Sequence, residues 1–182
     1  MKIGIIIGSI REGRCGASVG EWVLEQAQGR EGFDYEIVDL KSFDVPLLTS
    51  ATVPGAARKK YDSPQVTAWS QAIDACDAFI FVTPEYNHSV PGAFKNAFDS
   101  LGPEWTGKAV GVVSYGAESG VRAVEAWRPI VANFQMVDVR QQVSLSTFGE
   151  FDGTQVTPND RRPGEAKTLF GQLEKMTTAL RG

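Results

Sequence analysis

The sequence predicts a single α/β domain over residues 1–182, built on a parallel β-sheet. Short apolar runs that suit strands buried on both faces alternate with longer segments whose apolar residues recur at helical spacing. The chain has 42% hydrophobic and 22% charged residues, which is ordinary for one globular domain of this length. Strands separated by helices in this way form a parallel sheet with right-handed crossovers.

Five strands and five helices are expected along the chain. The strands are predicted at residues 3–7, 35–40, 78–82, 109–113 and 137–145, and the second has a mixed pattern typical of a position near a sheet edge. Helical spacing is found at residues 19–27, 66–76, 94–101, 121–134 and 169–180. Pro91 suits the first residue of the third helix, and Pro129 is expected to kink or divide the fourth. Two segments, 41–64 and 147–162, show no sustained period.

Composition and charge argue against several classes of protein. A formal net charge of −4 argues against nucleic acid as the main partner, because phosphate neutralisation requires a basic face. No apolar run approaches the roughly 20 residues that span a bilayer, and the N-terminus does not resemble a signal peptide. The two cysteines, Cys15 and Cys76, and the single histidine, His88, offer no metal-ligand spacing. A cytoplasmic protein without a metal site is therefore expected.

The first strand leads into a loop with the chemistry of an anion site. Glycine, serine and arginine residues follow it directly, and a helix begins after them, so unpaired N–H groups and the helix dipole favour a negative charge there. The spacing of Gly8 and Gly13 is close to that of a nucleotide P-loop, but Arg14 and Cys15 stand where lysine and a hydroxyl are needed, and no GxGxxG follows the strand. The remaining reading is a site for a single phosphate, with Arg11 as a planar cation; the alternative is a solvated turn.

Two further loops follow the third and fourth strands. Residues 84–87 (ProGluTyrAsn) present main-chain donors and acceptors suited to the edge of a flat heterocycle, and Tyr86 could supply an aromatic wall. Glu85 has no second carboxylate near it in sequence, and His88 is interpreted as a loop residue at the pocket rim, so a role of Glu85 as general acid is weak. Residues 114–116 either close the pocket or form an ordinary turn. The carboxyl ends of parallel strands share one edge, where ligands bind, so all three loops should converge.

Three motifs carry a resemblance to a known family. The segments GSIREGRCG at 8–16, TPEYNHSVPGAFKNAFD at 83–99 and EWTGKAVGVVSYGAESGVRAVEAWR at 104–128 resemble the NADPH-dependent FMN reductase family. The resemblance implies a flavodoxin-like three-layer sandwich with strand order 2-1-3-4-5. Relatives often have serine and asparagine near positions 14 and 16, so whether Arg14 faces phosphate or solvent stays open. The implied FMN-binding residues are Ser9, Arg11, Gly16, Ala17 and Ser18 at the phosphate, Pro84, Glu85, Tyr86 and Asn87 at the flavin edge, and Ser114, Tyr115 and Gly116 beside the ring.

The same resemblance implies an oxidoreductase. Hydride would pass from NADPH or NADH through bound FMN to a quinone, azo, metal-oxyanion or free flavin acceptor, and no side chain would need to act as acid or base. The family also implies a homodimer or homotetramer, with the partner helping to wall the flavin. Two alternatives bind FMN without oxidising nicotinamides: a flavodoxin-type electron carrier, against which the mild charge and Arg11 both count, and a flavin-binding sensor that uses residues 147–162 as a contact surface.

Overall fold

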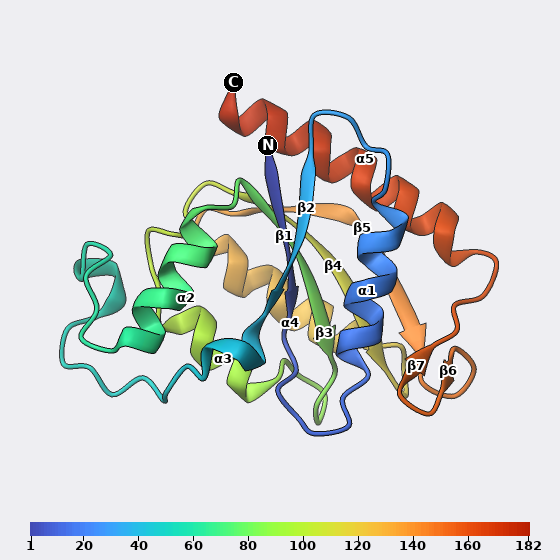
Figure 1. Ribbon diagram of the computed structural model, residues 1–182, viewed down its shortest axis with the longest axis horizontal. Coiled ribbons are helices and arrows are strands. Elements are labelled where there is room, and N and C mark those ends of the chain that lie inside the picture. The colour runs from blue at the N-terminus through green and yellow to red at the C-terminus, as the bar shows by residue number, and fades with distance from the viewer.

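The computed structural model describes all residues from 1 to 182 and places a five-stranded parallel sheet between two layers of helices (Figure 1). The strand order is β2-β1-β3-β4-β5, which confirms the predicted order and the edge position of the second strand. The strands are β1 (Lys2–Ile7), β2 (Asp34–Asp39), β3 (Ala78–Pro84), β4 (Ala109–Gly116) and β5 (Val137–Ser146). The helices are α1 (Gly16–Gln26), α2 (Pro64–Asp74), α3 (Gly92–Asp99), α4 (Val121–Ala132) and α5 (Arg162–Arg181).

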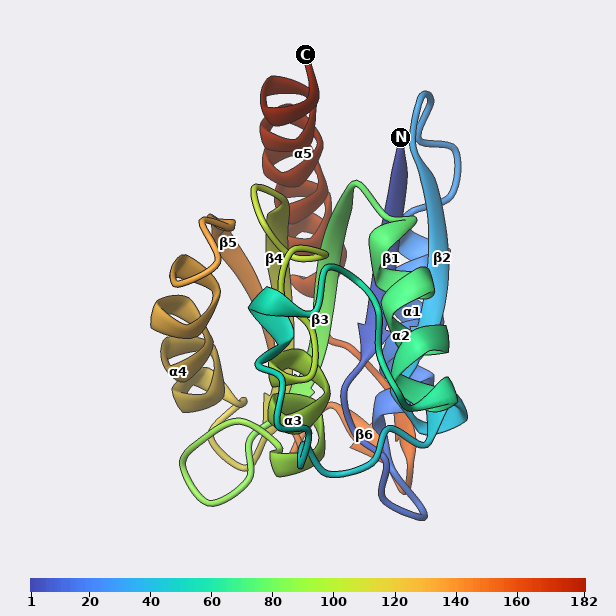
Figure 2. The same ribbon diagram turned by 90° about the vertical axis from the view of Figure 1, so that its left-hand side faces the viewer.

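Each face of the sheet has its own hydrophobic core. Helices α1 and α5 cover one face, and α2, α3 and α4 cover the other (Figure 2). Successive side chains of a strand point to opposite faces, so in β3 Phe79 and Phe81 join the core beneath α2–α4 while Ile80 and Val82 join the core beneath α1 and α5. The continuous apolar runs of the sequence follow directly from this burial on both sides. None of the helices combines the length and apolar character that crossing a bilayer requires.

Aromatic rings fill the core beneath α2–α4 and support the loop that follows β1. Phe94, at the start of α3, lies with its ring centroid 5.0 Å from that of Phe81 and 4.7 Å from that of Trp127. Trp127 directs its indole N–H to the hydroxyl of Thr83 at 3.3 Å, so its polar atom is satisfied inside the core. The ring of Phe94 packs so closely against Gly8 that a Cβ at that position would lie 2.1 Å from a ring carbon. The first loop therefore rests directly on a rigid aromatic core.

Three local predictions need correction. Pro129 does not divide α4, which continues past it to Ala132 and keeps Trp127 and Val131 buried, while a kink at Pro129 stays a prediction. Pro91 caps α3 with an extended backbone, and the helix begins one residue later. Residues 147–162 are not all irregular: they contain a small antiparallel hairpin of β6 (Phe151–Asp152) and β7 (Gln155–Val156). Short 3₁₀ helices at Leu40–Phe43 and Pro54–Ala56 interrupt the long connection after β2.

Lys108, just before β4, is a buried cation far from the three loops along its strand. It is 5% exposed, its Nζ donates to the carbonyl of Ile73 at the end of α2 at 2.9 Å, and it lies 5.3 Å from the ring centroid of Phe79. The carbonyls at a helix C-terminus attract positive charge, but burial disfavours it more strongly. Burial accordingly lowers the pKa of Lys108 to about 8.

This lowered pKa predicts a pH-dependent stability. Between about pH 8 and the ordinary lysine value the unfolded chain binds more protons than the folded one, so this group raises stability as pH increases. We expect the wild type to gain about 1.4 kcal/mol of unfolding free energy relative to Lys108→Met between roughly pH 7 and pH 9. Urea unfolding of both proteins at the two pH values measures the difference. The exposed Lys60→Met variant serves as control. If the difference in unfolding free energy between the wild type and Lys108→Met does not vary with pH, the lowered pKa of Lys108 is contradicted.

Candidate functional site

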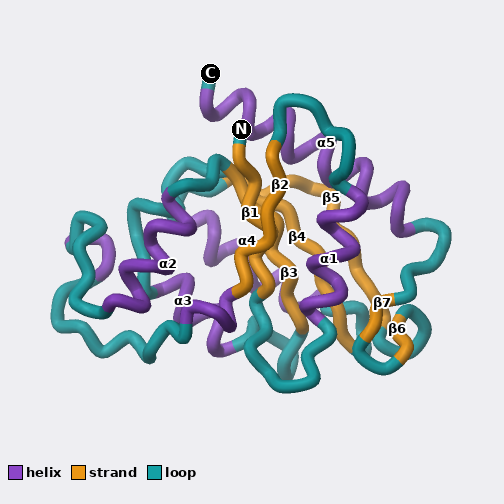
Figure 3. Tube along the Cα trace, in the orientation of Figure 1, coloured by secondary structure: helices purple, strands orange, loops and turns teal.

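The loops that follow β1, β3 and β4 meet at one edge of the sheet, as the parallel topology predicts (Figure 3). Main-chain hydrogen bonds join them where the strands end. The N–H of Gly8 donates to the carbonyl of Val82 at 2.9 Å, and the N–H of Glu85 donates to the carbonyl of Tyr115 at 3.0 Å. The three segments singled out from the sequence therefore form one continuous rim.

The loop after β1 is rich in unused donors. None of the backbone N–H groups of residues 9–18 donates a hydrogen bond within the chain, and α1 has no side-chain cap. Several of these residues, including Ser9 and Gly16, are buried, where an unpaired N–H is costly. A run of main-chain donors at a helix N-terminus suits an anion, so the donor set fits the phosphate group of FMN.

The two arginines of this loop have different environments. Arg11 is exposed, makes no ion pair, and holds its guanidinium 5.7 Å from the ring centroid of Tyr86. Arg14 is mostly buried, donates to the carbonyl of Ser9 at 2.6 Å, and makes a two-pronged ion pair with Asp39 at the end of β2. The hydrogen bonds to Asp39 raise the pKa of Arg14. Arg14 thus braces the loop, which answers the question left open by the sequence, and Arg11 is the free cation.

Two tyrosines connect the loop after β1 to the loops beside it. The hydroxyl of Tyr86 lies 2.8 Å from that of Ser9, so side chains from the first and second loops meet directly. Tyr115 turns its ring into the core beneath α1, where a Cβ at Gly16 would lie 2.7 Å from its hydroxyl oxygen. Burial, with a smaller contribution from Tyr86, raises the pKa of Tyr115. The close contact with Tyr115 therefore explains why residue 16 is a glycine.

Ser18, a predicted phosphate donor, has its hydroxyl engaged elsewhere. The oxygen lies 2.8 Å from the carbonyl of Thr154 and 2.9 Å from that of Cys15, and it accepts the N–H of Val156 at 3.1 Å. A hydroxyl has a single proton, which these carbonyls already use. The structure therefore leaves Ser18 with its main-chain N–H to offer a phosphate, along with those of Gly16 and Ala17.

The second loop is a tight turn. Tyr86 and Ser89 exchange main-chain hydrogen bonds of 3.0 and 3.1 Å, and between them Asn87 and His88 both adopt positive φ angles, 48° and 68°. Two successive positive φ angles define the turn that best fits a two-residue hairpin. This arrangement uses the N–H of Tyr86 within the turn and leaves that of Asn87 unpaired, while Pro84 is buried at the end of β3. Contacts of this turn with the flavin edge stay a prediction.

Glu85 is bound by a partner that sequence inspection did not identify. Its side chain is 8% exposed and accepts from the guanidinium of Arg122 at 2.9 Å and from the N–H of the same residue at 3.0 Å. Burial favours the neutral acid, but the hydrogen bonds from Arg122 outweigh it and hold the pKa of Glu85 below its usual range. Glu85 is thus an ionised cap at the start of α4, which is poorly suited to donating a proton.

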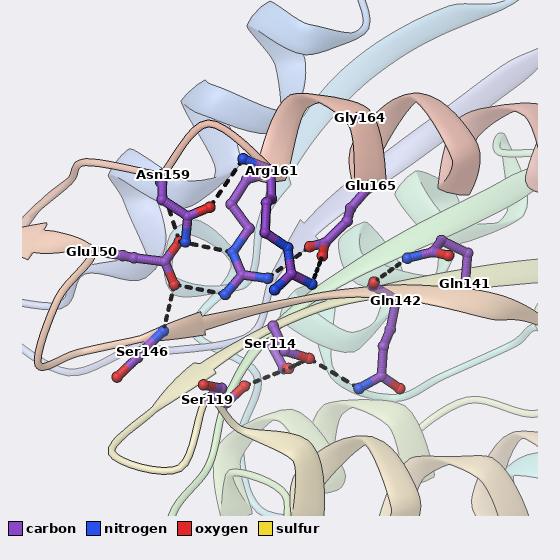
Figure 4. Close-up of polar contacts among 12 residues, drawn as sticks. Ser114, Ser119, Gln141, Gln142, Ser146, Glu150, Asn159, Arg161, Gly164 and Glu165 are labelled. Carbon is purple, nitrogen blue, oxygen red and sulfur yellow. Dashed lines mark hydrogen bonds and ion pairs between the residues drawn. The ribbon is translucent and has the colours of Figure 1, made fainter.

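The loop after β4 presents main-chain groups rather than side chains at the rim. Ser114 donates its hydroxyl to the carbonyl of Ser119 at 2.8 Å, a contact visible in Figure 4. The carbonyl of Gly116 accepts from Ser119 and from Thr147, both at 3.0 Å. Because Ser114 and Tyr115 point into the fold, the turn from Gly116 to Ser119 is the part of this loop that faces the rim. Its role beside the ring stays a prediction.

Comparison with known proteins supports the resemblance. Residues 1–150 match the family described as NADPH-dependent FMN reductase. The chain is 38% identical over 180 residues to an NAD(P)H-dependent FMN reductase of Schizosaccharomyces pombe, covering 96% of this chain and 90% of that one. It is 33% identical over 138 residues to a quinone reductase of Pseudomonas putida, covering 70% and 67%. The solved flavoenzyme NAD(P)H:(acceptor) oxidoreductase FerB of Paracoccus denitrificans shares the fold, with a TM-score of 0.68, 20% identity and coverage of 99% and 97%.

Proposed function

The chain belongs to the NADPH-dependent FMN reductase family, and from this membership we propose that it moves hydride from NADPH or NADH to a quinone, with the rim of three loops as its FMN site. The observation that supports this site most strongly is the run of unpaired N–H groups in residues 9–18 beside the free cation of Arg11. FMN, when bound, supplies the hydride-transfer chemistry. The residues of the chain have to bind, orient and shield it.

Each loop has a separate task in this proposal. Residues 9–18 hold the phosphate through main-chain donors and Arg11, and Arg14 keeps their loop fixed to β2 through Asp39. The Tyr86–Ser89 turn presents its backbone to the flavin edge, and the Gly116–Ser119 turn lies beside the ring. Azo compounds, metal oxyanions and free flavins also belong to the proposed range of acceptors, because FMN supplies the hydride-transfer chemistry.

A second copy of the chain is the proposed partner. The connection between β2 and α2 exposes three apolar side chains, Leu47 at 77%, Leu48 at 41% and Val53 at 66%, on a single segment. Exposed apolar groups that gather in this way mark contact surfaces. The proposed homodimer or homotetramer would cover them. Sedimentation velocity of the purified protein measures its mass in solution and so distinguishes a monomer, a dimer and a tetramer.

Steady-state turnover tests the proposed function. The purified protein, saturated with FMN, should oxidise NADPH continuously in the presence of a benzoquinone and should yield the hydroquinone. A flavodoxin-type carrier or a flavin-binding sensor would bind FMN and leave NADPH unoxidised, so this outcome would overturn the proposal while leaving the flavin site intact. NADH in place of NADPH establishes which nicotinamide is preferred.

The Glu85→Gln substitution is expected to keep most of the turnover. Glutamine preserves the size of the side chain and can still accept the N–H of Arg122, whereas it cannot act as an acid. A general acid contributes about 10²–10⁴-fold to a rate, and we expect a loss of about tenfold or less at saturating FMN. Glu125→Gln, an exposed change on α4, is the matched control. A thousandfold loss with flavin still bound would make Glu85 a catalytic acid.

A further inference from the structure

We propose that the β6–β7 hairpin, clasped by Glu150 and Arg162, positions the first turn of α1 for the phosphate of FMN. The inference rests on the proposed function, because it concerns the same cofactor site. It assigns Glu150, Arg162 and Ser18 as positioning residues, none of which has to touch the cofactor through its side chain. The hairpin lies beside the end of α1 at which the helix begins (Figure 1).

The hairpin is attached to α1 through Ser18. The hydroxyl of this residue, in the first turn of the helix, is held between the carbonyl of Thr154 and the N–H of Val156. These two contacts come from the turn and from β7, so they fix the hydroxyl in direction as well as distance. Cys15, the residue before the helix, places its Sγ 3.9 Å from the carbonyl of Gly153. The hairpin tip thus lies directly against the start of α1.

The hairpin needs support from outside itself. Its strands have two residues each, and a two-stranded hairpin is marginally stable at best in water. Its tip, from Asp152 to Gln155, is exposed. Only Phe151 and Val156, at its base, pack against the core beneath α1 and α5. Its position relative to α1 therefore depends on whatever closes the base.

Glu150 closes that base from a buried position. It is 4% exposed, and its carboxylate accepts from the N–H of Ser146 at the end of β5 and from both the N–H and the side-chain amide of Asn159 beyond the hairpin (Figure 4). Arg162, the first residue of α5, adds two parallel bonds of 2.7 and 2.8 Å. Burial acts to raise the pKa of Glu150, but the bonds from Arg162 and the backbone lower it, so the carboxylate is charged. The clasp connects β5, the hairpin and α5.

A displaced start of α1 should lower the affinity for FMN and leave the affinity for riboflavin unchanged. FMN and riboflavin share the isoalloxazine ring and the ribityl chain, and the phosphate is the group that distinguishes them. If the clasp sets the direction of the N–H groups of Gly16, Ala17 and Ser18, loosening it weakens hydrogen bonds to the phosphate alone. General damage to the fold would instead weaken both ligands together.

The test compares two neighbouring arginines. Arg162→Gln removes the two parallel bonds of the clasp, whereas Arg161→Gln changes an 80% exposed side chain that pairs only with Glu165. We expect Arg162→Gln to raise the dissociation constant for FMN about tenfold, the scale of one weakened charge-assisted hydrogen bond, and to leave that for riboflavin within about twofold. Arg161→Gln should change neither. Calorimetric titration of the full-length apoprotein with each ligand gives the four values.

A double-mutant cycle separates positioning from direct contact. Ser18→Ala should lower FMN affinity to a similar extent, and adding it to Arg162→Gln should cost little more, because both changes release the same hairpin. If the side chain of Ser18 instead bound the phosphate directly, the two losses would multiply. Glu150→Gln, which keeps the shape of the carboxylate, repeats the test should Arg162→Gln fold poorly, and thermal unfolding of each apoprotein verifies folding.

The outcomes distinguish this inference from the proposed function. If the wild type prefers FMN but the clasp variants keep that preference, the hairpin is only structural and the inference fails, while the reductase proposal stands. Multiplicative losses in the cycle also overturn it. If the wild type binds riboflavin as tightly as FMN, the phosphate site itself is absent and the inference fails with it. Absence of NADPH turnover would contradict the reductase proposal without touching the binding preference.

Discussion

Replacing Arg11 with alanine is expected to weaken FMN binding by about 1.5–3 kcal/mol, the scale of a lost hydrogen bond to a charged group. Arg11 is the cation of the proposed phosphate loop that makes no ion pair, since Arg14 is occupied by Asp39 and the carbonyl of Ser9. Its planar fork can meet two phosphate oxygens at once. Because the side chain is exposed, the unfolding free energy of the apoprotein should change far less than the affinity.

Matched measurements on Arg11 variants separate binding of the phosphate from binding of the rest of FMN. Riboflavin affinity should be unchanged by Arg11→Ala, and Arg11→Lys should fall between the wild type and the alanine variant because it keeps the charge without the fork. Arg140→Ala removes an exposed arginine that makes no ion pair on β5, and it controls for net charge alone. An FMN dissociation constant that Arg11→Ala leaves unaltered would mean that the main-chain donors hold the phosphate unaided.

Replacing Gly8 with alanine is expected to lower the unfolding free energy by about 1–3 kcal/mol, the usual cost of forcing an extra group into a packed core. The new Cβ would lie 2.1, 2.7 and 2.8 Å from three ring carbons of Phe94. That ring cannot move aside freely, because it is fully buried between Phe81 and Trp127. Since Gly8 also begins the proposed phosphate loop, FMN affinity should fall together with stability.

Two further variants test the reason given for Gly8. Gly92→Ala, at the start of α3, places a methyl group where nothing lies within 4 Å, and it should not destabilise the fold. Phe94→Leu is destabilising by itself, but it should partly restore the stability of Gly8→Ala. The smaller leucine side chain removes the ring carbons with which the new Cβ would clash. Equal losses for Gly8→Ala in the presence and absence of Phe94→Leu would show that the clash is not the cause.

The sheet could be predicted from the sequence because burial on both faces leaves a strong local signal. Runs such as those of β1, β3 and β4 must be apolar at every position, and the position of the three loops followed from the parallel topology alone. The fifth strand was less regular for a reason that no local pattern shows: its register against β4 shifts between Val110 and Val112, and Gln141 lies within the shifted stretch. Such a shift depends on the neighbouring strand.

The details of the site depended on partners remote in sequence. Glu85 and Arg122, or Arg14 and Asp39, are joined only by the fold, so their pairing could not be deduced from spacing. The hairpin had a signal that was overlooked: Gly153 at the turn, with a φ of 58°, between the apolar residues Phe151 and Val156. Ser18 was correctly placed at the start of α1, but the engagement of its hydroxyl is set by a contact 136 residues away.

The separation of Ser18 from Thr154 by 136 residues bears on when the cofactor site is completed during folding. Residues 9–18 and all five strands of the sheet lie before residue 147, yet the contact of Ser18 with Thr154 needs a segment that follows the sheet in the chain. Domains form contacts of such high sequence separation late, because the entropy of closing the intervening loop has to be overcome first. FMN is therefore expected to bind at full affinity only after the β6–β7 hairpin has packed against the start of α1, late in folding.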